Sequence, residues 1–298
     1  MNTELNNMSH TKEIVQRIIS ETIEEQLKVI TISPVSGGCI HNAQKVVTEK
    51  GDYFIKMNNA SDLDMFKTEY SGLELLASAR EINVPEPIAF GILDGQAYLI
   101  LKFIHGGPRR SSFWDDFGIA LANLHKNHQN DRYGLSYNNY IGRLDQFNKF
   151  SEDWISFFIE QRLEVQMKLA FDNGYIDRAY LENCTRFYQK LPDLLPVEPP
   201  SLLHGDLWSG NFMTGEEGQP VIIDPAVYFG HREIELSFTQ MFGGFDRQFY
   251  RKYKEVYPLE PGFENRVEIY NIYPHLVHVN LFGPSYLGGV TPIIRRYV

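Results

Sequence analysis

Two neighbouring segments are the most informative about the fold and function of this chain: LLHGDLWSGN at residues 202–211 and VIIDP at residues 221–225. Asp206 is followed five residues later by Asn211, and Asp224 closes a short apolar strand. Phosphoryl transfer of the kinase type needs this set, because one carboxylate meets the acceptor hydroxyl while an amide oxygen and a second carboxylate supply hard ligands for Mg²⁺. The same residue types also dominate ordinary turns, so support must come from elsewhere in the chain.

The first hundred residues supply that support. Lys56 lies in the apolar segment YFIKM, where a lysine is out of character unless its ammonium meets an anion, and Glu69 follows thirteen residues later on an expected helix. A strand lysine tied to a helix glutamate is the phosphate-binding half of the same machinery. The turn at Gly37 and Gly38 lets backbone N–H groups approach phosphate oxygens, although it lacks the G-x-G-x-x-G spacing and also suits a plain hairpin. An outward-facing Lys56 with a solvated Glu69 is the structural alternative.

Hydrophobic periodicity predicts an α+β chain in which a small β-rich lobe, residues 1–103, precedes a larger helical lobe, residues 104–298. A cleft between the lobes is the expected ligand site. The expected strands are 29–33, 44–48, 53–57, 98–103 and 221–223, and the expected helices are 12–29, 62–79, 111–127, 151–172, 177–190, 231–242, 246–255 and 262–281.

Composition narrows the function. The chain has 298 residues and a net charge of −10, the wrong sign for wrapping nucleic acid or an anionic membrane. It has no apolar run long enough to span a bilayer, and its polar start predicts a cytoplasmic protein without a leader. The cysteines Cys39 and Cys184 lie far apart and indicate neither a disulfide framework nor a zinc site.

Three segments carry a family resemblance: HGDLWSGN, DPAVYFGHREIELSFTQMFGGF at residues 224–245, and GFENRVEIYNIYPHLVHVNLFG at residues 262–283. They resemble the fructosamine kinase (ketosamine-3-kinase) family of the aminoglycoside-phosphotransferase and protein-kinase-like superfamily, from about Pro34 to Gly283. The resemblance implies a two-lobed protein-kinase-like fold, with a small antiparallel N-lobe and a mainly helical C-lobe. It also implies ATP-dependent phosphorylation, at O3, of the sugar of ketoamines on small amines or proteins. The phosphorylated adduct then releases the amine, which is a deglycation repair step.

By this resemblance Asp206 is the catalytic base, and Asn211 and Asp224 are magnesium ligands. Lys56 contacts the α- and β-phosphates of ATP, and Glu69 orients Lys56.

The segment Leu99–Phe103 is the expected hinge, where Leu101 and Phe103 offer backbone groups to adenine. Lys102 stands where the family usually has Glu, which puts nucleotide preference in question more than nucleotide binding. Glu235 stands where many relatives carry Asp, and its longer side chain can alter how the catalytic loop is braced.

Trp208 and His278 are the substrate-side candidates, since an indole two residues after the base can cover the C–H face of a sugar. Structural alternatives are a Trp208 that wedges the loop and a His278 that only packs, as expected for His125 and His275. Oxidation at Cys39 is a further hypothesis, set against an inert side chain. Two rival functions remain: a related kinase acting on an aminoglycoside, choline or homoserine-like alcohol, and a non-catalytic nucleotide-binding regulator.

Overall fold

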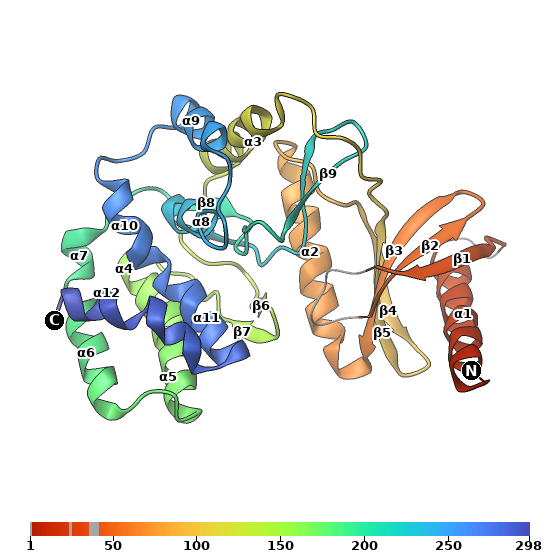
Figure 1. Cartoon of the computed structure of the whole chain (residues 1–298), viewed down its shortest axis with the longest axis horizontal. Helices are drawn as coiled ribbons and strands as arrows, with labels where there is room; N and C mark the ends of the chain where they lie inside the picture. The colour runs from red at the N-terminus through yellow and green to blue at the C-terminus, as the bar shows by residue number, and fades with distance from the viewer. Residues whose placement is uncertain (1, 24–25, 36–41) are drawn as a thin grey trace.

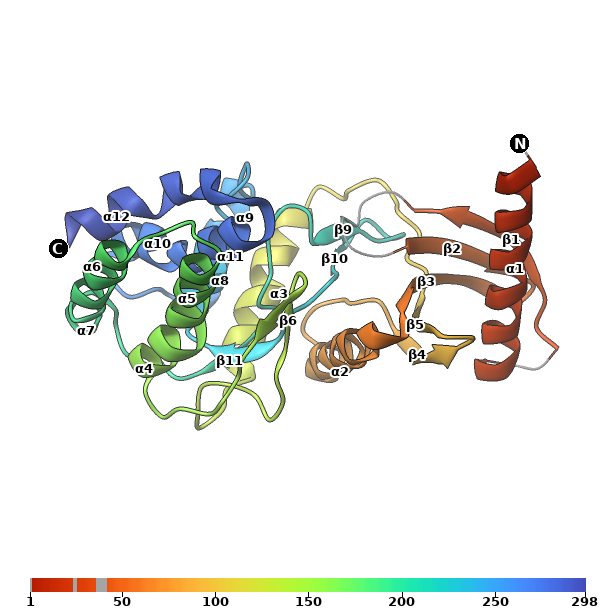
Figure 2. The same ribbon diagram turned by 90° about the horizontal axis from the view of Figure 1, so that it is seen from below.

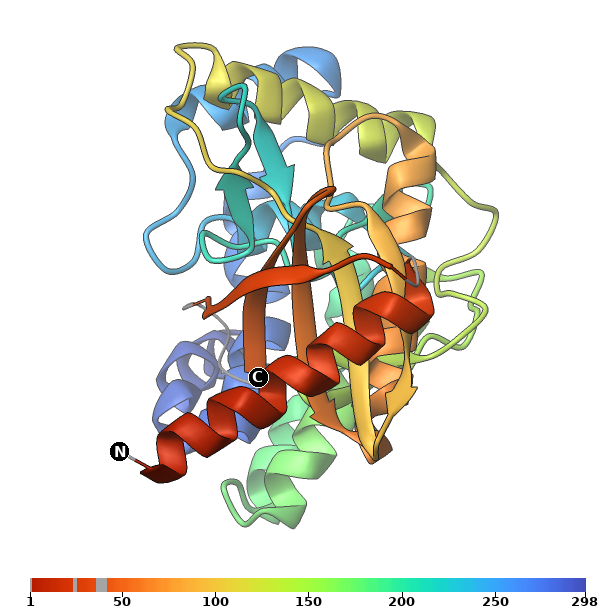
Figure 3. The same cartoon turned by 90° about the vertical axis from the view of Figure 1, so that its right-hand side faces the viewer.

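The smaller lobe is an antiparallel five-stranded sheet with one helix on each face (Figures 1 and 3). The computed structural model describes residues 2–23, 26–35 and 42–298, with side chains from residue 11 onward. The strand order is β1-β2-β3-β5-β4. Its elements are α1 (Asn2–Thr22), β1 (Val29–Pro34), β2 (Asn42–Thr48), β3 (Gly51–Asn59), η1 (Ala60–Asp62), α2 (Leu63–Ala79), β4 (Pro87–Leu93) and β5 (Gln96–Lys102).

Each face of this sheet has its own core, because successive side chains of a strand point to opposite faces. Ile100 packs with Ile14 and Ile18 of α1, whereas Leu99 and Leu101 on the same strand pack with Phe66 of α2. The helices therefore fix the register of β5, since a slip of one residue would exchange its two faces.

In the larger lobe, helices and three short two-stranded antiparallel sheets surround one extended core. Helix α3 packs along α9, and the two-stranded sheets pair β6 with β7, β8 with β11, and β9 with β10. Its elements are α3 (Phe113–Asn127), β6 (Asn139–Ile141), β7 (Leu144–Gln146), α4 (Trp154–Phe158), the π-helical turn η2 (Ile159–Leu163), α5 (Glu164–Asp172), α6 (Arg178–Tyr188), α7 (Leu191–Leu194), β8 (Ser201–Leu203), β9 (Phe212–Thr214), β10 (Pro220–Ile222), β11 (Tyr228–Gly230), α8 (Arg232–Phe238), α9 (Arg247–Val256), α10 (Phe263–Tyr270), α11 (Ile272–Phe282), η3 (Pro284–Gly289) and α12 (Thr291–Arg296).

The linker after β5 runs beside the β9–β10 hairpin between the lobes (Figure 2). Gly107 N donates to Gly215 O at 3.2 Å and Arg110 N donates to Gly218 O at 3.3 Å. Gly107 lies so close to the carbonyl of Glu216 that an added Cβ would overlap it. The linker is thus tied to the hairpin that separates Asn211 from Asp224.

The two-lobed α+β fold and most of the expected elements are confirmed, with several corrections to their bounds. Helix α1 ends at Thr22 instead of residue 29, because the chain must extend into β1. Strand β4 was not expected, since Pro87 and Gly91 hide the strand pattern. The expected helix 262–281 is broken at Asn271, and the expected helix 231–242 ends at Phe238.

Three residues of the expected phosphate loop, Gly37, Gly38 and Cys39, lie outside the described residues. In the described part of the chain, no helix combines the length and apolarity needed to cross a membrane.

Candidate active site

The loop at residues 204–211 (the 204–211 loop) connects β8 to β9 and carries Asp206 and Asn211. The Asn211 amide donates from Nδ2 to both the backbone oxygen and Oδ2 of Asp206, each at 2.8 Å. Ile223 N donates to Asn211 O at 3.0 Å, which joins the loop to the strand that ends before Asp224. The five-residue spacing therefore lets Asn211, an expected metal ligand, hydrogen-bond directly to Asp206, the expected base.

Lys56 of β3 lies between two carboxylates, one from each lobe. Its Nζ is 2.7 Å from Glu69 Oε1 of α2 and 2.8 Å from Asp224 Oδ1, although 168 residues separate it from Asp224. Burial alone would lower the pKa of Lys56, but the charges and hydrogen bonds of Asp224 and Glu69 raise it overall. The ammonium is therefore permanently charged at the interface between the lobes, and its expected outward-facing alternative is excluded.

Asp224 follows β10 with a φ of +56°, in the left-handed region that few non-glycine residues occupy. Its side chain remains 44% exposed despite its contact with Lys56. Burial raises the pKa of Asp206 well above its ordinary value, the Asn211 hydrogen bond opposes this shift, and the charge of Asp224 adds to it. The negative charge of Asp224 is therefore part of the electrostatic environment of Asp206.

A buried carboxylate on α8, Glu235, holds the start of the 204–211 loop. Its Oε1 accepts from His204 N at 3.1 Å and from His125 Nε2 at 3.0 Å, and its Oε2 accepts from Gly205 N at 2.7 Å. Burial would raise the pKa of Glu235, but hydrogen bonding from His125 and the surrounding donors lower it overall. Glu235 is thus an ionised acceptor shared by α3, α8 and the loop.

His204 completes the bracing. Its Nε2 donates to Ile223 O at 2.8 Å, and its Nδ1 accepts from Asp206 N at 3.2 Å. Burial lowers the pKa of His204, which keeps the neutral tautomer that these two bonds require. The His204 imidazole thereby links the backbone at Asp206 to the backbone just before Asp224.

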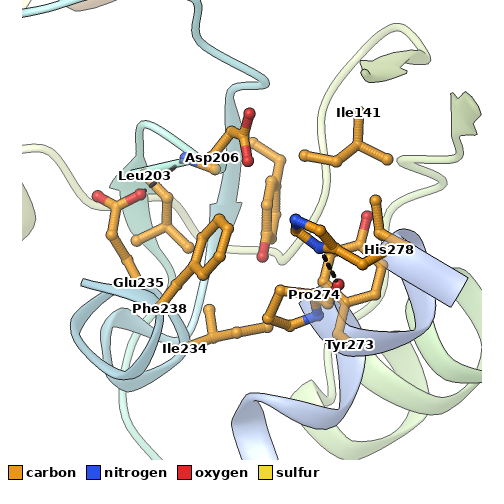
Figure 4. A pocket seen from close by; sticks show the side chains of 12 residues that line it. Ile141, Leu203, Asp206, Ile234, Glu235, Phe238, Tyr273, Pro274 and His278 are labelled. Carbon is orange, nitrogen blue, oxygen red and sulfur yellow. Dashed lines mark hydrogen bonds between the residues drawn. The ribbon is translucent and has the colours of Figure 1, made fainter. Parts of the chain in front are cut away.

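A small cavity opens beside Asp206, and His278 of α11 lines it (Figure 4). The cavity has a volume of about 20 Å³, room for one or two water molecules. His278 Nδ1 donates to Pro274 O at 2.7 Å, and burial lowers the pKa of the imidazole, so Nε2 of the neutral ring is an acceptor. The remaining lining residues include Ile141, Tyr228, Phe238 and Tyr273.

Trp208 is not among the residues that line this cavity. Its indole folds back over Gly210, where an added Cβ would overlap the ring, and its ring centroid lies 5.7 Å from that of Phe242. The Phe242 ring in turn lies 4.9 Å from the His278 ring. Trp208, Phe242 and His278 thus form a row of rings leading to the cavity, and the substrate role of Trp208 and His278 remains a prediction.

The hinge backbone is partly engaged in the sheet. Phe103 N donates to Asp52 O at 3.1 Å, and Lys102 N donates to Glu86 O at 2.8 Å. Phe103 can therefore contact adenine through its carbonyl oxygen and its ring, because its N–H is already engaged. Leu101 is buried within β5, and the exposed side chain of Lys102 points away from the core.

Sequence reasoning missed Ile141, Tyr228 and Tyr273, which shape the cavity. Ile141 belongs to a hairpin of two three-residue strands, too short for a periodic signal. The dense run of Asn and Gln around it, YNNYIGRLDQFN at residues 137–148, was the available signal. In the structure, Asn139, Gln146 and Asn148 are buried.

The fold and the converging groups define the protein-kinase-like class of phosphotransferases, with Lys56 contributed by one lobe and Asp206, Asn211 and Asp224 by the other. At the level of fold alone, the chain is similar to spectinomycin phosphotransferase solved with ADP and spectinomycin, at 17% identity and a TM-score of 0.58 over 95% of this chain and 92% of that chain.

Closer similarities identify the family. The fructosamine kinase family model matches residues 11–298, so the chain belongs to the fructosamine kinase family. The chain is 38% identical to the probable ketoamine kinase of Synechocystis over 90% of each protein. It is 38% identical to the chloroplastic protein-ribulosamine 3-kinase of Arabidopsis thaliana, covering 91% of this chain and 83% of that protein. A crystal structure of a candidate fructosamine-3-kinase of Haemophilus somnus matches with a TM-score of 0.86 at 27% identity, covering 96% of this chain and 97% of that chain.

Proposed function

We propose that this chain transfers the γ-phosphoryl group of ATP to O3 of the sugar of a ketoamine, carried on a small amine or a protein. Family membership supports the reaction class, and the relatives named ketoamine and ribulosamine kinases support the substrate class. The observation that carries the proposal is the 2.8 Å contact between Lys56 and Asp224, because it joins the two lobes at the point where the proposed mechanism needs the triphosphate.

In this proposal Lys56 contacts the α- and β-phosphates, and Glu69 fixes the direction of its ammonium. Lys56 is 6% exposed and already ordered between two carboxylates, so little side-chain entropy remains to be lost when phosphate oxygens replace one of them. Adenine is held at the hinge around Leu101 and Phe103.

Asn211 and Asp224 are the proposed ligands of Mg²⁺. Their oxygens suit a hard cation, and Asn211 directs its Nδ2 toward Asp206, which leaves the amide Oδ1 facing elsewhere. Among the described residues, no three His, Cys, Asp or Glu side chains cluster into a metal site. The bound ion would neutralise charge on the phosphates.

Asp206 is the proposed base. The attacking hydroxyl of the sugar gives its proton to Asp206, the O3–phosphorus bond forms, and the bond from the γ-phosphorus to the bridging oxygen breaks to release ADP. A carboxyl pKa raised by burial suits a base that must hold a proton at this stage. The Trp208, Phe242 and His278 rings border the acceptor. Loss of the phosphorylated sugar from the amine afterwards would complete a deglycation step.

The test compares Asp206→Asn with the wild type and with Asp172→Asn, a change of a surface aspartate paired to Lys168. ADP release is measured with fructosyl-, ribulosyl- and erythrulosyl-lysine and with an aminoglycoside, choline and homoserine as acceptors. We expect ketoamine-dependent ADP release that Asp206→Asn abolishes and Asp172→Asn preserves, while binding of a non-hydrolysable ATP analogue is unchanged. Near-normal turnover by Asp206→Asn would refute the base, and a preference for the other alcohols would refute the substrate class.

A further inference from the structure

One buried cation of the larger lobe has no place in the scheme above. Arg162, in the π-helical turn η2, is fully buried, yet in the described part of the chain no ion pair joins its guanidinium to a carboxylate. The other two buried arginines of this lobe are conventional: Arg232 pairs with Glu198 and Arg266 pairs with Glu233. Buried charges are ordinarily paired, because removal from water is costly.

The guanidinium is held by neutral oxygens instead. Nη1 donates to Phe147 O at 2.5 Å and to Gln161 O at 3.0 Å, and Nη2 donates to Asn148 Oδ1 at 2.7 Å. Nε is buried with no hydrogen-bond partner among the described groups. These contacts do not offset a full charge as a carboxylate would, so the fold retains Arg162 at a cost that an apolar side chain would avoid.

The geometry around Arg162 leads to the wall of the cavity beside Asp206. The guanidinium carbon lies 4.0 Å from the centroid of the Tyr228 ring and 5.7 Å from that of Tyr273. Both tyrosines line the cavity. A planar guanidinium can stack on a ring face while its fork reaches neighbouring acceptors, which an ammonium cannot do.

A chain of buried amides extends this support to the rest of the wall. Asn148 donates to Asn139 Oδ1 at 2.8 Å, and Gln146 donates to the same oxygen at 2.9 Å and to Ala226 O at 3.0 Å. Tyr273 OH donates to Gln146 Oε1 at 2.8 Å. The network thereby joins the β6–β7 hairpin, which presents Ile141 to the cavity, to the segment just after Asp224.

We propose that Arg162 is a positioning residue for the acceptor: it fixes Tyr228 directly, and Tyr273 and Ile141 through the amide network, in the geometry that receives the sugar beside Asp206. This inference rests on the proposed function, because it takes the cavity, which has room for only one or two water molecules, as the inner wall of the acceptor site. The π-helical turn fits this role, since such turns interrupt α-helices at functional sites more often than elsewhere. Arg162 acts through the wall and touches neither substrate.

The test measures initial rates against fructosyl-lysine and ATP separately for Arg162→Met, Arg162→Lys and Tyr273→Phe. We expect the KM for fructosyl-lysine to rise at least tenfold in Arg162→Met, with a smaller rise in Arg162→Lys, which keeps the charge without the fork. Tyr273→Phe, which removes one hydroxyl, should raise it about threefold. The KM for ATP should stay within twofold in all three.

The matched control is Tyr188→Phe, which also removes a buried tyrosine hydroxyl, one that has no hydrogen-bond partner among the described residues. It should leave both KM values unchanged. If Arg162→Met does not fold, Tyr273→Phe decides, and an unchanged KM for fructosyl-lysine in folded Tyr273→Phe overturns the proposal. Equal increases in both KM values would also overturn it, because they would indicate a general structural role. A wild-type protein that phosphorylates no ketoamine refutes the proposed function, and with it the basis of this inference.

Discussion

Replacing Glu235 by glutamine tests whether its carboxylate positions the catalytic groups. The three donors around it are His204 N, Gly205 N and His125 Nε2, at 3.1, 2.7 and 3.0 Å. Glutamine has one acceptor oxygen and one donor nitrogen, so in either orientation a buried backbone N–H of the 204–211 loop faces another donor. His125 can change tautomer to compensate, but a backbone amide cannot.

The loss of stability in Glu235→Gln can be worked out from the number of donors left without an acceptor. One buried donor left without an acceptor costs about 1–3 kcal/mol, and the loss of charge assistance in the remaining bonds brings the total to roughly 2–4 kcal/mol. A protein stable by about 5–15 kcal/mol should survive this loss with a lower Tm. A displacement of Asp206 by about 1 Å should lower kcat about 100-fold, whereas the KM for ATP, set largely by the other lobe, should change little.

The matched control is Glu233→Gln, two residues earlier on the same helix. Glu233 is equally buried, but it pairs with Arg266 and makes no contact with the 204–211 loop among the described interactions. Both variants should unfold at lower urea concentration than the wild type, but kcat per folded molecule should fall in Glu235→Gln alone. A folded Glu235→Gln with wild-type kcat would refute the positioning argument.

Three further predictions concern other parts of the molecule. Lys56→Met should lower kcat/KM for ATP by at least about 100-fold, equivalent to roughly 3 kcal/mol, because it removes the ammonium that Glu69 and Asp224 hold in place for the phosphates. A fall of less than threefold in ATP titrations would contradict the assignment of Lys56 to the phosphates. Burial lowers the pKa of His231 to about 4 from an ordinary 6.5, so the unfolded chain binds more protons between these values. The free energy of unfolding should therefore drop by up to about 3 kcal/mol as the pH falls through that window, and urea unfolding of His231→Gln should show a flatter dependence, whereas an unchanged slope would contradict the assignment. Gly205→Ala should lower both Tm and kcat, because at a φ of +83° its Cβ would overlap Ala226 O, whereas Gly174→Ala, at +72° with open space around it, should lower Tm slightly and leave kcat intact; equal Tm losses would contradict the argument.

The order of chemical groups along the sequence predicted part of the candidate site. Lys56 contacts Glu69 as the kinase-type order predicts, whereas its direct contact with Asp224 and the contact between Asn211 and Asp206 were not predicted. The contact between Lys56 and Glu69 is predictable because β3 and α2 each have a clear hydrophobic period, whereas Asp206 and Asn211 lie in a loop between two three-residue strands. The roles assigned to Trp208 and His278 stay predictions, since ring packing alone does not distinguish a sugar platform from a wedge.

The supports of the site could not be predicted in the same way. The π-helical turn containing Arg162 lies inside a segment whose apolar spacing reads as one continuous helix. The partners of Glu235 come from α3 and from the loop after β8, and no local pattern relates these elements to α8. These contacts are set by tertiary packing. In a single sequence they leave only polar residues within apolar segments, with no indication of their partners.

The way Glu235 is shared has a consequence for how activity and stability are linked in this lobe. Its carboxylate accepts from His125, whose Nδ1 lies 2.8 Å from Tyr253 OH on α9, and α3 packs along α9. The backbone beside Asp206 is thus held by a chain of buried contacts that runs through the packed helices. Because close-packed interiors transmit small displacements, substitutions in the α3–α9 interface should reduce kcat as well as Tm, although no residue of either helix lines the cavity beside Asp206. A catalytic loop braced only by its own turn would lose stability and activity independently.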